Sequence, residues 1–324
     1  MTSFTELYSR FQHLLDQKKI SGHPASLYDP IQYFVNIGGK RIRPILVMMS
    51  AELFGANAED GIDAAMAVEL FHNFSLIHDD IMDQAPLRRG QQTIHEKHGL
   101  PTAILTGDAT LVLAYQYFEK YPAEKALALL RVFNETSLGV CEGQQEDMDF
   151  EKIENTSVAM YQEMIRKKTA ILLGCAMQMG AIIANAPKEK QTLAYTFGVK
   201  TGLAFQLQDD YLDAFATSNN SGKQVGGDIL ANKKTFLWLR LKEKASKNDL
   251  LEIATWESKK EFDPVLKVNY FTSKMEEYGV KEESRLLIEK YTKEAYATLE
   301  MLSEDRSKTA ELYKLANQLL DRTN

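Results

Sequence analysis

The chain has 324 residues, with 45 acidic and 38 basic side chains and a formal net charge of -7 at pH 7. Its length exceeds one typical domain but its composition shows no break, so one large domain fits as well as two; we take residues 1–324 as one domain. Because basic runs are few and no Lys/Arg stripe is interleaved with aromatic residues, the composition argues against a nucleic-acid partner.

No run of about 18 apolar residues occurs, so the sequence predicts no transmembrane segment and a soluble, cytoplasmic protein. The two cysteines, Cys141 and Cys175, lie in apolar helical contexts without metal-ligand spacing. Their scarcity is typical of a reducing compartment. We therefore expect both to be buried free thiols.

The sequence predicts helix after helix, beginning with an amphipathic helix within residues 1–17, and shows no convincing period-two strand. Pro44 fits the first turn of a helix, and the other prolines are expected mostly at helix boundaries. These boundary residues are Pro24, Pro30, Pro86, Pro101, Pro122, Pro187 and Pro264.

The stretch Asn36–Pro44, NIGGKRIRP, combines two glycines with three basic residues, Lys40, Arg41 and Arg43. Gly38 and Gly39 free the backbone, so that main-chain N–H groups can approach a phosphate. A helix starting near Pro44 would point its positive end at the same place. The stretch is therefore a candidate anion clamp; the alternative is a helix-entry turn with solvated basic side chains.

An apolar helical run within Val68–Gly90 ends in acidic residues, which are Asp79, Asp80 and Asp83. Asp79 and Asp83 lie about 40° apart around a helix axis, and such close carboxylates favour a bound cation. Mg²⁺ prefers oxygen ligands and often binds carboxylates together with substrate phosphates, for which Arg88 and Arg89 supply donors. The alternative is a solvated acidic helix end.

Three helical segments are expected between Pro101 and Asn185. The first contains small residues that suggest close packing against a neighbour, namely Ala103, Gly107, Ala109 and Ala114. The second, from Ala123 to about Phe150, is interrupted at Gly139 and Gly143 and ends in acid. The third starts near Val158, carries Lys168 and Thr169 midway and then becomes apolar. Lys168 and Thr169 are a snorkelling side chain and a capping hydroxyl, or they face a polar cavity.

The acidic pattern recurs in Phe205–Asp213, FQLQDDYLD, where an apolar helix delivers Asp209, Asp210 and Asp213. Because the pattern occurs twice, solvated helix ends are a poor explanation for it. If the two motifs face each other across a cavity, they would hold Mg²⁺ ions that bind a diphosphate. Downstream, the glycine-rich stretch Ser221–Thr235 carries Lys223, Lys233 and Lys234. It would supply further phosphate donors, or it is a mobile, solvated connection.

These motifs, in this order from about Gly38 to Thr235, resemble the trans-isoprenyl diphosphate synthases, or polyprenyl synthetases. The matching motifs are GGKRIRP, DDIMD, LRRG, the KT pair, FQLQDD and the GGD…KKT loop. The resemblance implies an all-α isoprenoid-synthase fold, a helical bundle around a deep central cavity, and usually a homodimer. It also implies a Mg²⁺-dependent, head-to-tail condensation of isopentenyl diphosphate with an allylic diphosphate.

The resemblance also assigns roles residue by residue. The Mg²⁺ ligands would be Asp79, Asp83 and Asp209, supported by Asp80, Asp210 and Asp213. Isopentenyl diphosphate would be held by Lys40, Arg43, His72 and Arg89. The allylic diphosphate would be held by Arg88, Lys168, Lys223 and Lys233. Thr169 and Gln206 would lie near the developing allylic cation, and with Lys168 they are the candidate catalytic residues.

Product length should depend on the cavity floor beneath Asp79. Phe71 and Phe74 share a helical face there, and in the family a bulky ring at this place stops chain growth. The small Ser75 leaves room, and DDIMD lacks an insertion, so we expect geranylgeranyl diphosphate, with farnesyl diphosphate as the alternative. The alternative is that both rings are ordinary core residues that do not set the product length. A terpene cyclase of the same fold is the other alternative, and a non-catalytic partner subunit would have lost motifs that are present here.

Overall fold

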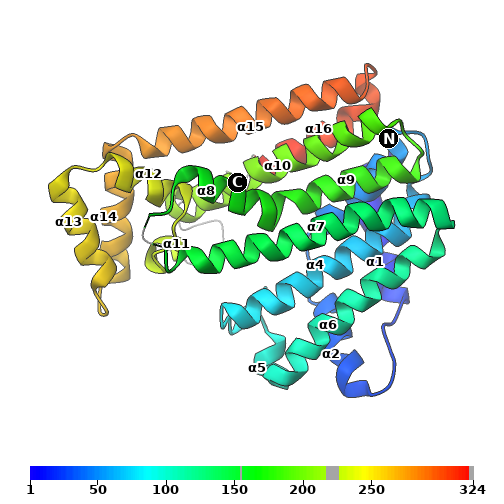
Figure 1. Ribbon diagram of the computed structural model, residues 1–324, viewed down its shortest axis with the longest axis horizontal. Helices are drawn as coiled ribbons and strands as arrows, with labels where there is room; N and C mark the ends of the chain where they lie inside the picture. The colour runs from blue at the N-terminus through cyan, green and yellow to red at the C-terminus, as the bar shows by residue number, and fades with distance from the viewer. Residues whose placement is uncertain (154, 217–225, 321–324) are drawn as a thin grey trace. The chain divides into compact units, whose positions relative to one another are not determined.

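The computed structural model describes residues 1–153, 155–216 and 226–320. Helices dominate these residues, and the all-α prediction is confirmed (Figure 1). The α-helices are α1 Phe4–Gln17, α2 Ala25–Asn36, α3 Ile42–Leu53, α4 Ile62–Met82, α5 Ile94–His98, α6 Leu100–Gln116, α7 Ala123–Phe150, α8 Val158–Ile165, α9 Ile171–Ile183, α10 Lys188–Phe215, α11 Gly227–Leu230, α12 Phe236–Lys244, α13 Lys247–Ser258, α14 Pro264–Glu277, α15 Val280–Leu302 and α16 Arg306–Leu320.

Shorter elements connect some of these helices. Two 3₁₀ turns, Ala58–Gly61 and Tyr117–Lys120, precede α4 and follow α6, and a π-helical segment, Arg166–Ala170, joins α8 to α9. The strands found in the described residues are β1 Leu87–Arg88 and β2 Gln91–Gln92, paired antiparallel. They are too short to show an alternating pattern, so the sequence could not reveal them.

The chain divides into two compact units. The first comprises residues 1–138, 172–198 and 299–312, and the second comprises residues 139–171, 199–298 and 313–324. Several unit boundaries fall inside helices, including α7, α10, α15 and α16. The assignment of residues 1–324 to one domain stays a prediction.

In the first unit, α4 packs against α3 and α6. Phe71, Phe118 and Phe133 are fully buried, and the ring of Phe133 lies 5.3 Å from that of Phe71 and 5.0 Å from that of Phe118. Gly107 of α6 lies so close to the His78 ring of α4 that a Cβ would not fit. The small residues of α6 therefore allow close helix packing, as the sequence predicted.

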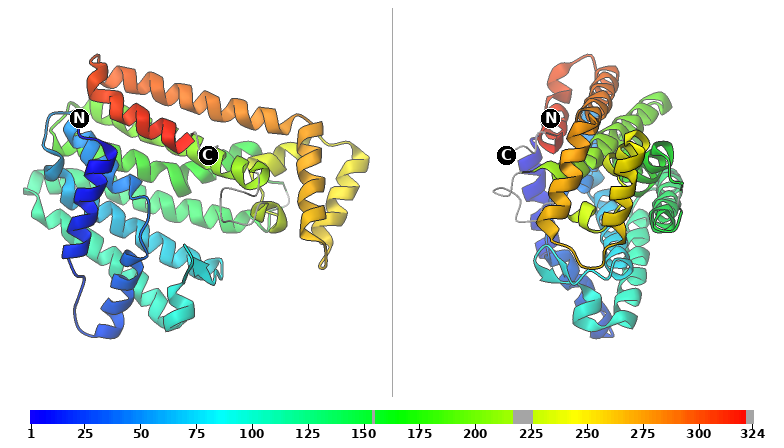
Figure 2. Two further views of the ribbon diagram at one scale, coloured as in Figure 1. Left: turned by 180° about the vertical axis from the view of Figure 1, so that it is seen from behind. Right: turned by 90° about the vertical axis from the view of Figure 1, so that its left-hand side faces the viewer.

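In the second unit, glycines bring α7 and α10 close to the π-helical segment. A Cβ on Gly202 of α10 would lie 2.6 Å from Ala170 Cα, and one on Gly143 of α7 would collide with the backbone N of Lys168. Farther along the chain, α13 and α14 lie side by side, and α14 packs against α11 and α12 (Figure 2).

Several expectations about local structure are wrong. Pro30 lies inside α2 and is buried, so apolar packing compensates for the hydrogen bond that its nitrogen cannot donate. Gly139 and Gly143 do not interrupt α7, because a helical glycine costs only about 1 kcal/mol and Gly143 is needed for the close packing described above. Cys175 is a buried free thiol as predicted, but Cys141 is exposed.

None of the helices formed by the described residues combines the length and apolar character that crossing a bilayer requires.

Candidate functional site

The glycine-rich turn before α3 holds an arginine from a distant hairpin. Gly38 and Gly39 have φ of 85° and 153°, and Arg89 Nη1 donates a hydrogen bond to the carbonyl oxygen of Gly38. A Cβ on Gly39 would lie 2.6 Å from Arg89 Nη1. The glycines therefore provide the space in which the Arg89 guanidinium lies against the backbone, while Lys40 on the same turn is exposed.

Arg41 of this turn has a structural role that the sequence pattern concealed. Its side chain is buried, forms an ion pair with Glu69 of α4 and donates a 2.7 Å hydrogen bond to the carbonyl oxygen of Val35. It thus ties the end of α2 to α4. Because its charge is already paired, Arg41 is a poor candidate for holding a substrate, unlike its neighbours Lys40 and Arg43.

Arg43 and His72 form a positively charged pair. Arg43 Nη1 donates a 3.1 Å hydrogen bond to His72 Nε2, and Arg43 Nε is buried without a hydrogen-bond partner among the described residues. Burial lowers the pKa of Arg43 to about 10, and the charge of Arg89 acts in the same direction. Burial and the surrounding arginines also lower the pKa of His72, so His72 is neutral at pH 7 and accepts from Arg43. Such a concentration of positive charge favours an anion.

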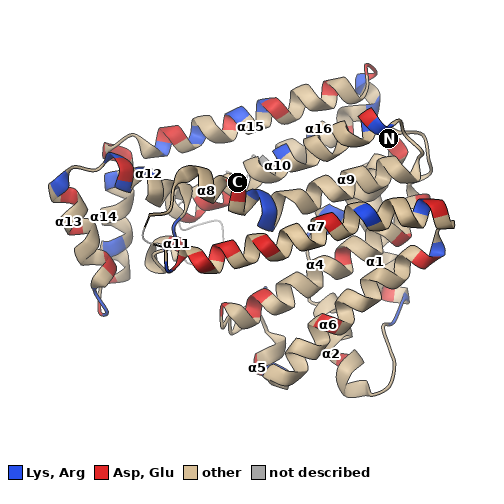
Figure 3. Ribbon diagram, viewed as in Figure 1, with Lys and Arg blue, Asp and Glu red and all other residues tan. Residues whose placement is uncertain are grey.

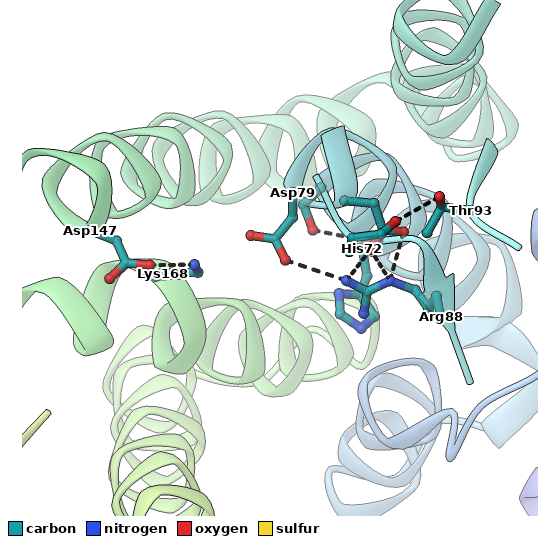
Figure 4. Close-up of polar contacts among 9 residues, drawn as sticks. His72, Asp79, Arg88, Thr93, Asp147 and Lys168 are labelled. Atoms are coloured by element: carbon teal, nitrogen blue, oxygen red, sulfur yellow. Dashed lines mark hydrogen bonds and ion pairs between the residues drawn. The ribbon is translucent and has the colours of Figure 1, made fainter. Parts of the chain in front are cut away.

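The first acidic motif surrounds Arg88 at the end of α4 (Figure 4). Asp80 is buried and accepts hydrogen bonds of 2.8 Å from Arg88 Nε at both carboxylate oxygens, while Arg88 Nη2 lies 3.4 Å from Asp79 Oδ2. Burial raises the pKa of Asp80, and the Arg88 guanidinium opposes this change. Asp83, the C-cap of α4, is exposed. The turn between β1 and β2 places Arg89 and Gly90 at positive φ, as a two-residue hairpin requires.

In the second unit, the π-helical segment presents basic residues to the acidic end of α7. Lys168 Nζ lies 2.7 Å from Asp147 Oδ2 (Figure 4). Lys167 Nζ lies 2.5 Å from Glu146 Oε1. Figure 3 shows acidic residues recurring along this end of α7. A π-helical turn inside a helix often occurs at functional sites, and it offsets Lys168 and Thr169 from regular α-helical positions.

A hydrogen-bonded chain links this segment to the second acidic motif. Thr169 Oγ1 donates to Gln206 Oε1 at 3.1 Å, and Gln206 Nε2 donates to Asp210 Oδ1 at 3.0 Å. Tyr161 Oη donates to the other oxygen of Asp210. Burial raises the pKa of Asp210 to about 8, the charge of Asp228 acts in the same direction, and the hydrogen bonds from Tyr161 and Gln206 oppose it.

The segment after residue 225 is attached to the same acidic motif. The backbone N–H groups of Gly226 and Asp228 donate to the carbonyl oxygen and the Oδ2 of Asp213, at 2.7 and 2.9 Å. Lys233 is exposed and lies 3.7 Å from Asp228 Oδ1. Lys234 instead donates hydrogen bonds to carbonyl oxygens at and beyond the end of α7. Lys223 lies outside the described residues.

A family model described as polyprenyl synthetase matches residues 24–270. The chain belongs to the polyprenyl synthetase family. A geranylgeranyl diphosphate synthase of Methanosarcina mazei is 37% identical over 77% of this chain and 79% of its own length. A crystal structure of a geranylgeranyl pyrophosphate synthase superimposes with a TM-score of 0.94 at 45% identity, covering 100% of both chains.

A third similar protein was solved with ligands. The crystal structure of a polyprenyl synthase from Caulobacter crescentus complexed with calcium and isoprenyl diphosphate matches with a TM-score of 0.86 at 26% identity, over 99% of this chain and 96% of that one. Together these matches confirm the family, the isoprenoid-synthase helical fold and the prenyltransferase activity that the motifs predicted. The predicted roles of individual residues are not tested by the matches and stay predictions.

The carboxylates of the two acidic motifs are oxygen donors of the kind that Mg²⁺ prefers. Within the described ranges, no three His, Cys, Asp or Glu side chains are grouped as a metal site. Mg²⁺ commonly takes only one or two protein carboxylates and completes its coordination with water and phosphate oxygens. The predicted Mg²⁺ ligands, Asp79 and Asp83 in the first motif and Asp209 in the second, are donors of this kind, and their role stays a prediction.

Sequence reasoning missed two residues that contact the acidic motifs of this family member. Tyr161 belongs to no quoted motif, and only the fold brings it to Asp210. Asp228 was inside the GGD motif but received no role, although its backbone and side chain lie against Asp213 and Lys233. Nothing in the sequence around Tyr161 indicates its contact with Asp210. The position of Asp228 between glycines and lysines, by contrast, was a signal from which a role could have been predicted.

Proposed function

We propose that this polyprenyl synthetase condenses isopentenyl diphosphate with an allylic diphosphate and that its main product is geranylgeranyl diphosphate. The proposal rests above all on the Arg43–His72 pair with Arg89, a cationic cluster near the first acidic motif in the same unit. An enzyme that only ionises an allylic diphosphate has no use for a second diphosphate site. The names of the similar proteins support the product class.

Each diphosphate would be held by its own basic residues. Lys40, Arg43, His72 and Arg89 would bind isopentenyl diphosphate. Arg88, Lys168, Lys223 and Lys233 would bind the allylic diphosphate. Asp79, Asp83 and Asp209 would ligate Mg²⁺, and Asp80, Asp210 and Asp213 would support them within the same motifs. When bound, Mg²⁺ would stabilise the negative charge that develops on the departing diphosphate.

The reaction follows from where charge develops. Cleavage of the carbon–oxygen bond of the allylic diphosphate would release the diphosphate and leave a carbocation, which the oxygen dipoles of Thr169 and Gln206 would stabilise where water is excluded. The double bond of isopentenyl diphosphate attacks this cation, and the released diphosphate takes up the proton whose loss restores an alkene. The hydrogen bond between Thr169 and Gln206 keeps both side chains in one place for this role.

The test is product analysis with purified protein, Mg²⁺, isopentenyl diphosphate and dimethylallyl, geranyl or farnesyl diphosphate in turn. We expect all three primers to be elongated and geranylgeranyl diphosphate to accumulate on chromatography. Accumulation of farnesyl diphosphate alone would support the shorter product. A hydrocarbon formed from farnesyl diphosphate without isopentenyl diphosphate would instead indicate a terpene cyclase and contradict the proposal.

We also propose that residues 1–324 act as one domain in a cytoplasmic homodimer. Exposed apolar side chains on α6 and α7 support the dimer: Leu105 and Val112 are each 59% exposed and lie seven residues apart on one face of α6, and Leu138 is 64% exposed on α7. Exposed apolar residues that share a face are typical of an interface.

The substrates are proposed to be small anions and not a nucleic acid. The negative net charge and the absence of basic runs in the sequence favour small anions that are bound by a few basic side chains.

A further inference from the structure

Residues 226–235 carry two of the groups nearest the second acidic motif, Asp228 and Lys233. On one side, this segment is bound to Asp213 through the backbone N–H groups of Gly226 and Asp228. The backbone hydrogen bonds within the segment are local, such as that from the N–H of Lys233 to the carbonyl oxygen of Asp228 at 2.9 Å. Lys234 ties the end of the segment to the carbonyl oxygens of Phe150 and Ile153, and the position of the remainder depends on what packs against its other side.

That other side is covered by α14, which contributes a buried lysine. Lys267 is 0% exposed, and its Nζ donates hydrogen bonds to Asn232 Oδ1 at 2.7 Å and to the carbonyl oxygen of Leu230 at 3.3 Å. The ammonium also lies 4.4 Å from the ring centroid of Phe262. Within the described part of the chain no carboxylate forms an ion pair with Lys267. Burying an ammonium is costly, so these neutral acceptors are what keeps it there.

The contacts of α14 reach both ends of the segment. The residue after Lys267, Val268, fills the space beside Gly226 so closely that a Cβ on Gly226 would collide with it. Asn232 adopts a left-handed conformation with φ of 54°, and its Nδ2 donates to the carbonyl oxygen of Glu257 at 3.3 Å. The Asn232 amide thus joins α14, the end of α13 and the segment in one place.

We propose that Lys267 is a positioning residue for the allylic diphosphate: by holding Leu230 and Asn232, it fixes the segment that presents Asp228 and Lys233 beside Asp213. Lys267 does not touch substrate; it acts through residues 226–235. This inference rests on the proposed function, in which Lys233 binds the allylic diphosphate. It predicts that loss of the ammonium weakens one substrate and spares the other, because isopentenyl diphosphate is held by residues of the first unit.

The test compares Lys267→Met with Lys274→Met. Methionine keeps the unbranched side chain and removes the ammonium, and Lys274 is a matched control because it lies on the same helix but pairs with Asp249 and Glu277. We expect Lys267→Met to raise KM for the allylic diphosphate roughly tenfold and to leave KM for isopentenyl diphosphate within about twofold. The control should change neither value. A parallel rise in both KM values, or no rise in either, would overturn the proposal.

Hydrogen exchange gives a readout that does not depend on catalysis. The amides of Leu230, Ala231 and Lys233 should exchange faster in Lys267→Met, while the amides of α15 keep wild-type rates. If Lys267→Met does not fold, Asn232→Gly decides, because glycine accepts the left-handed conformation and the change removes only the side-chain amide, which accepts from Lys267 and donates to the carbonyl oxygen of Glu257; the same selective rise in KM is expected. Wild-type protein that elongates no primer would contradict the proposed function. An active wild type, together with unchanged hydrogen exchange in Lys267→Met, would contradict only this inference.

Discussion

Asp80 and Asp210 occupy the same place in the two acidic motifs, and both are buried and hydrogen-bonded. Asp80 is bound by Arg88, and Asp210 by Tyr161 and Gln206. Their neighbours Asp79 and Asp209 are more accessible. In each motif, therefore, hydrogen bonds hold the second aspartate in place and the first is more exposed, which favours the roles proposed for them.

Replacing Asp79 or Asp209 by alanine should lower turnover by at least about two orders of magnitude, because each change removes a carboxylate proposed to bind Mg²⁺ with the diphosphate. The measurement is steady-state product formation, with circular dichroism to show that the fold persists. Asp16→Ala is the control, since this carboxylate is exposed on α1 and belongs to neither acidic motif. Near-normal turnover in either purified variant would contradict the metal assignment.

Phe74→Ala should lengthen the product. Phe74 is 9% exposed, and its ring lies 5.5 Å from that of Phe71 and 4.9 Å from that of His78, so truncation opens space below Asp79. We also expect a loss of about 3–5 kcal/mol in the free energy of unfolding. Phe118→Ala, in the same aromatic cluster, should destabilise similarly without changing chain length. Chromatography of the products checks this, and an unchanged length would show that Phe74 is ordinary core.

At the scale of elements, the position of the π-helical segment depends on close helix packing. Gly202→Ala should lower the free energy of unfolding by about 1–3 kcal/mol and reduce turnover, because its Cβ would meet the Ala170 backbone and displace Thr169. Gly139→Ala is a matched control: its Cβ would meet only the flexible end of Ile171, 2.6 Å away. Urea unfolding of both variants is the measurement, and equal effects would refute this account of the segment.

Asp249 joins α13 to α14 and should make stability depend on pH. Hydrogen bonds from Lys274, Tyr278 and Ser246 lower the pKa of Asp249 to about 2, from 3.8. Because the folded-state pKa is the lower one, the contribution of Asp249 is fully present above about pH 4 and is lost as the pH falls toward 2. Urea unfolding across this range should show a shallower pH dependence for Asp249→Asn than for the wild type. Identical slopes would contradict the assignment.

At the scale of the whole molecule, assembly is the feature to test. Val112→Glu combined with Leu105→Glu should convert the proposed dimer to a monomer, because it places charge in the apolar face of α6. Light scattering after size exclusion measures the mass. Leu251→Glu is the control, since this leucine is 70% exposed on α13. A wild-type monomer, or a dimer that survives the double substitution, would contradict the proposed interface.

Sequence alone determined the helical class, the family and the residues of its motifs, because helix periodicity and short charged motifs are local properties of the chain. Gly38 and Gly39, for example, had to adopt conformations that other residues rarely adopt, and they do. Only the tertiary structure decided which charges are buried and already paired. Arg41 meets Glu69, Tyr161 meets Asp210 and Lys267 meets Asn232 across long sequence separations. Such contacts arise from packing between distant helices, and local patterns carry no record of them.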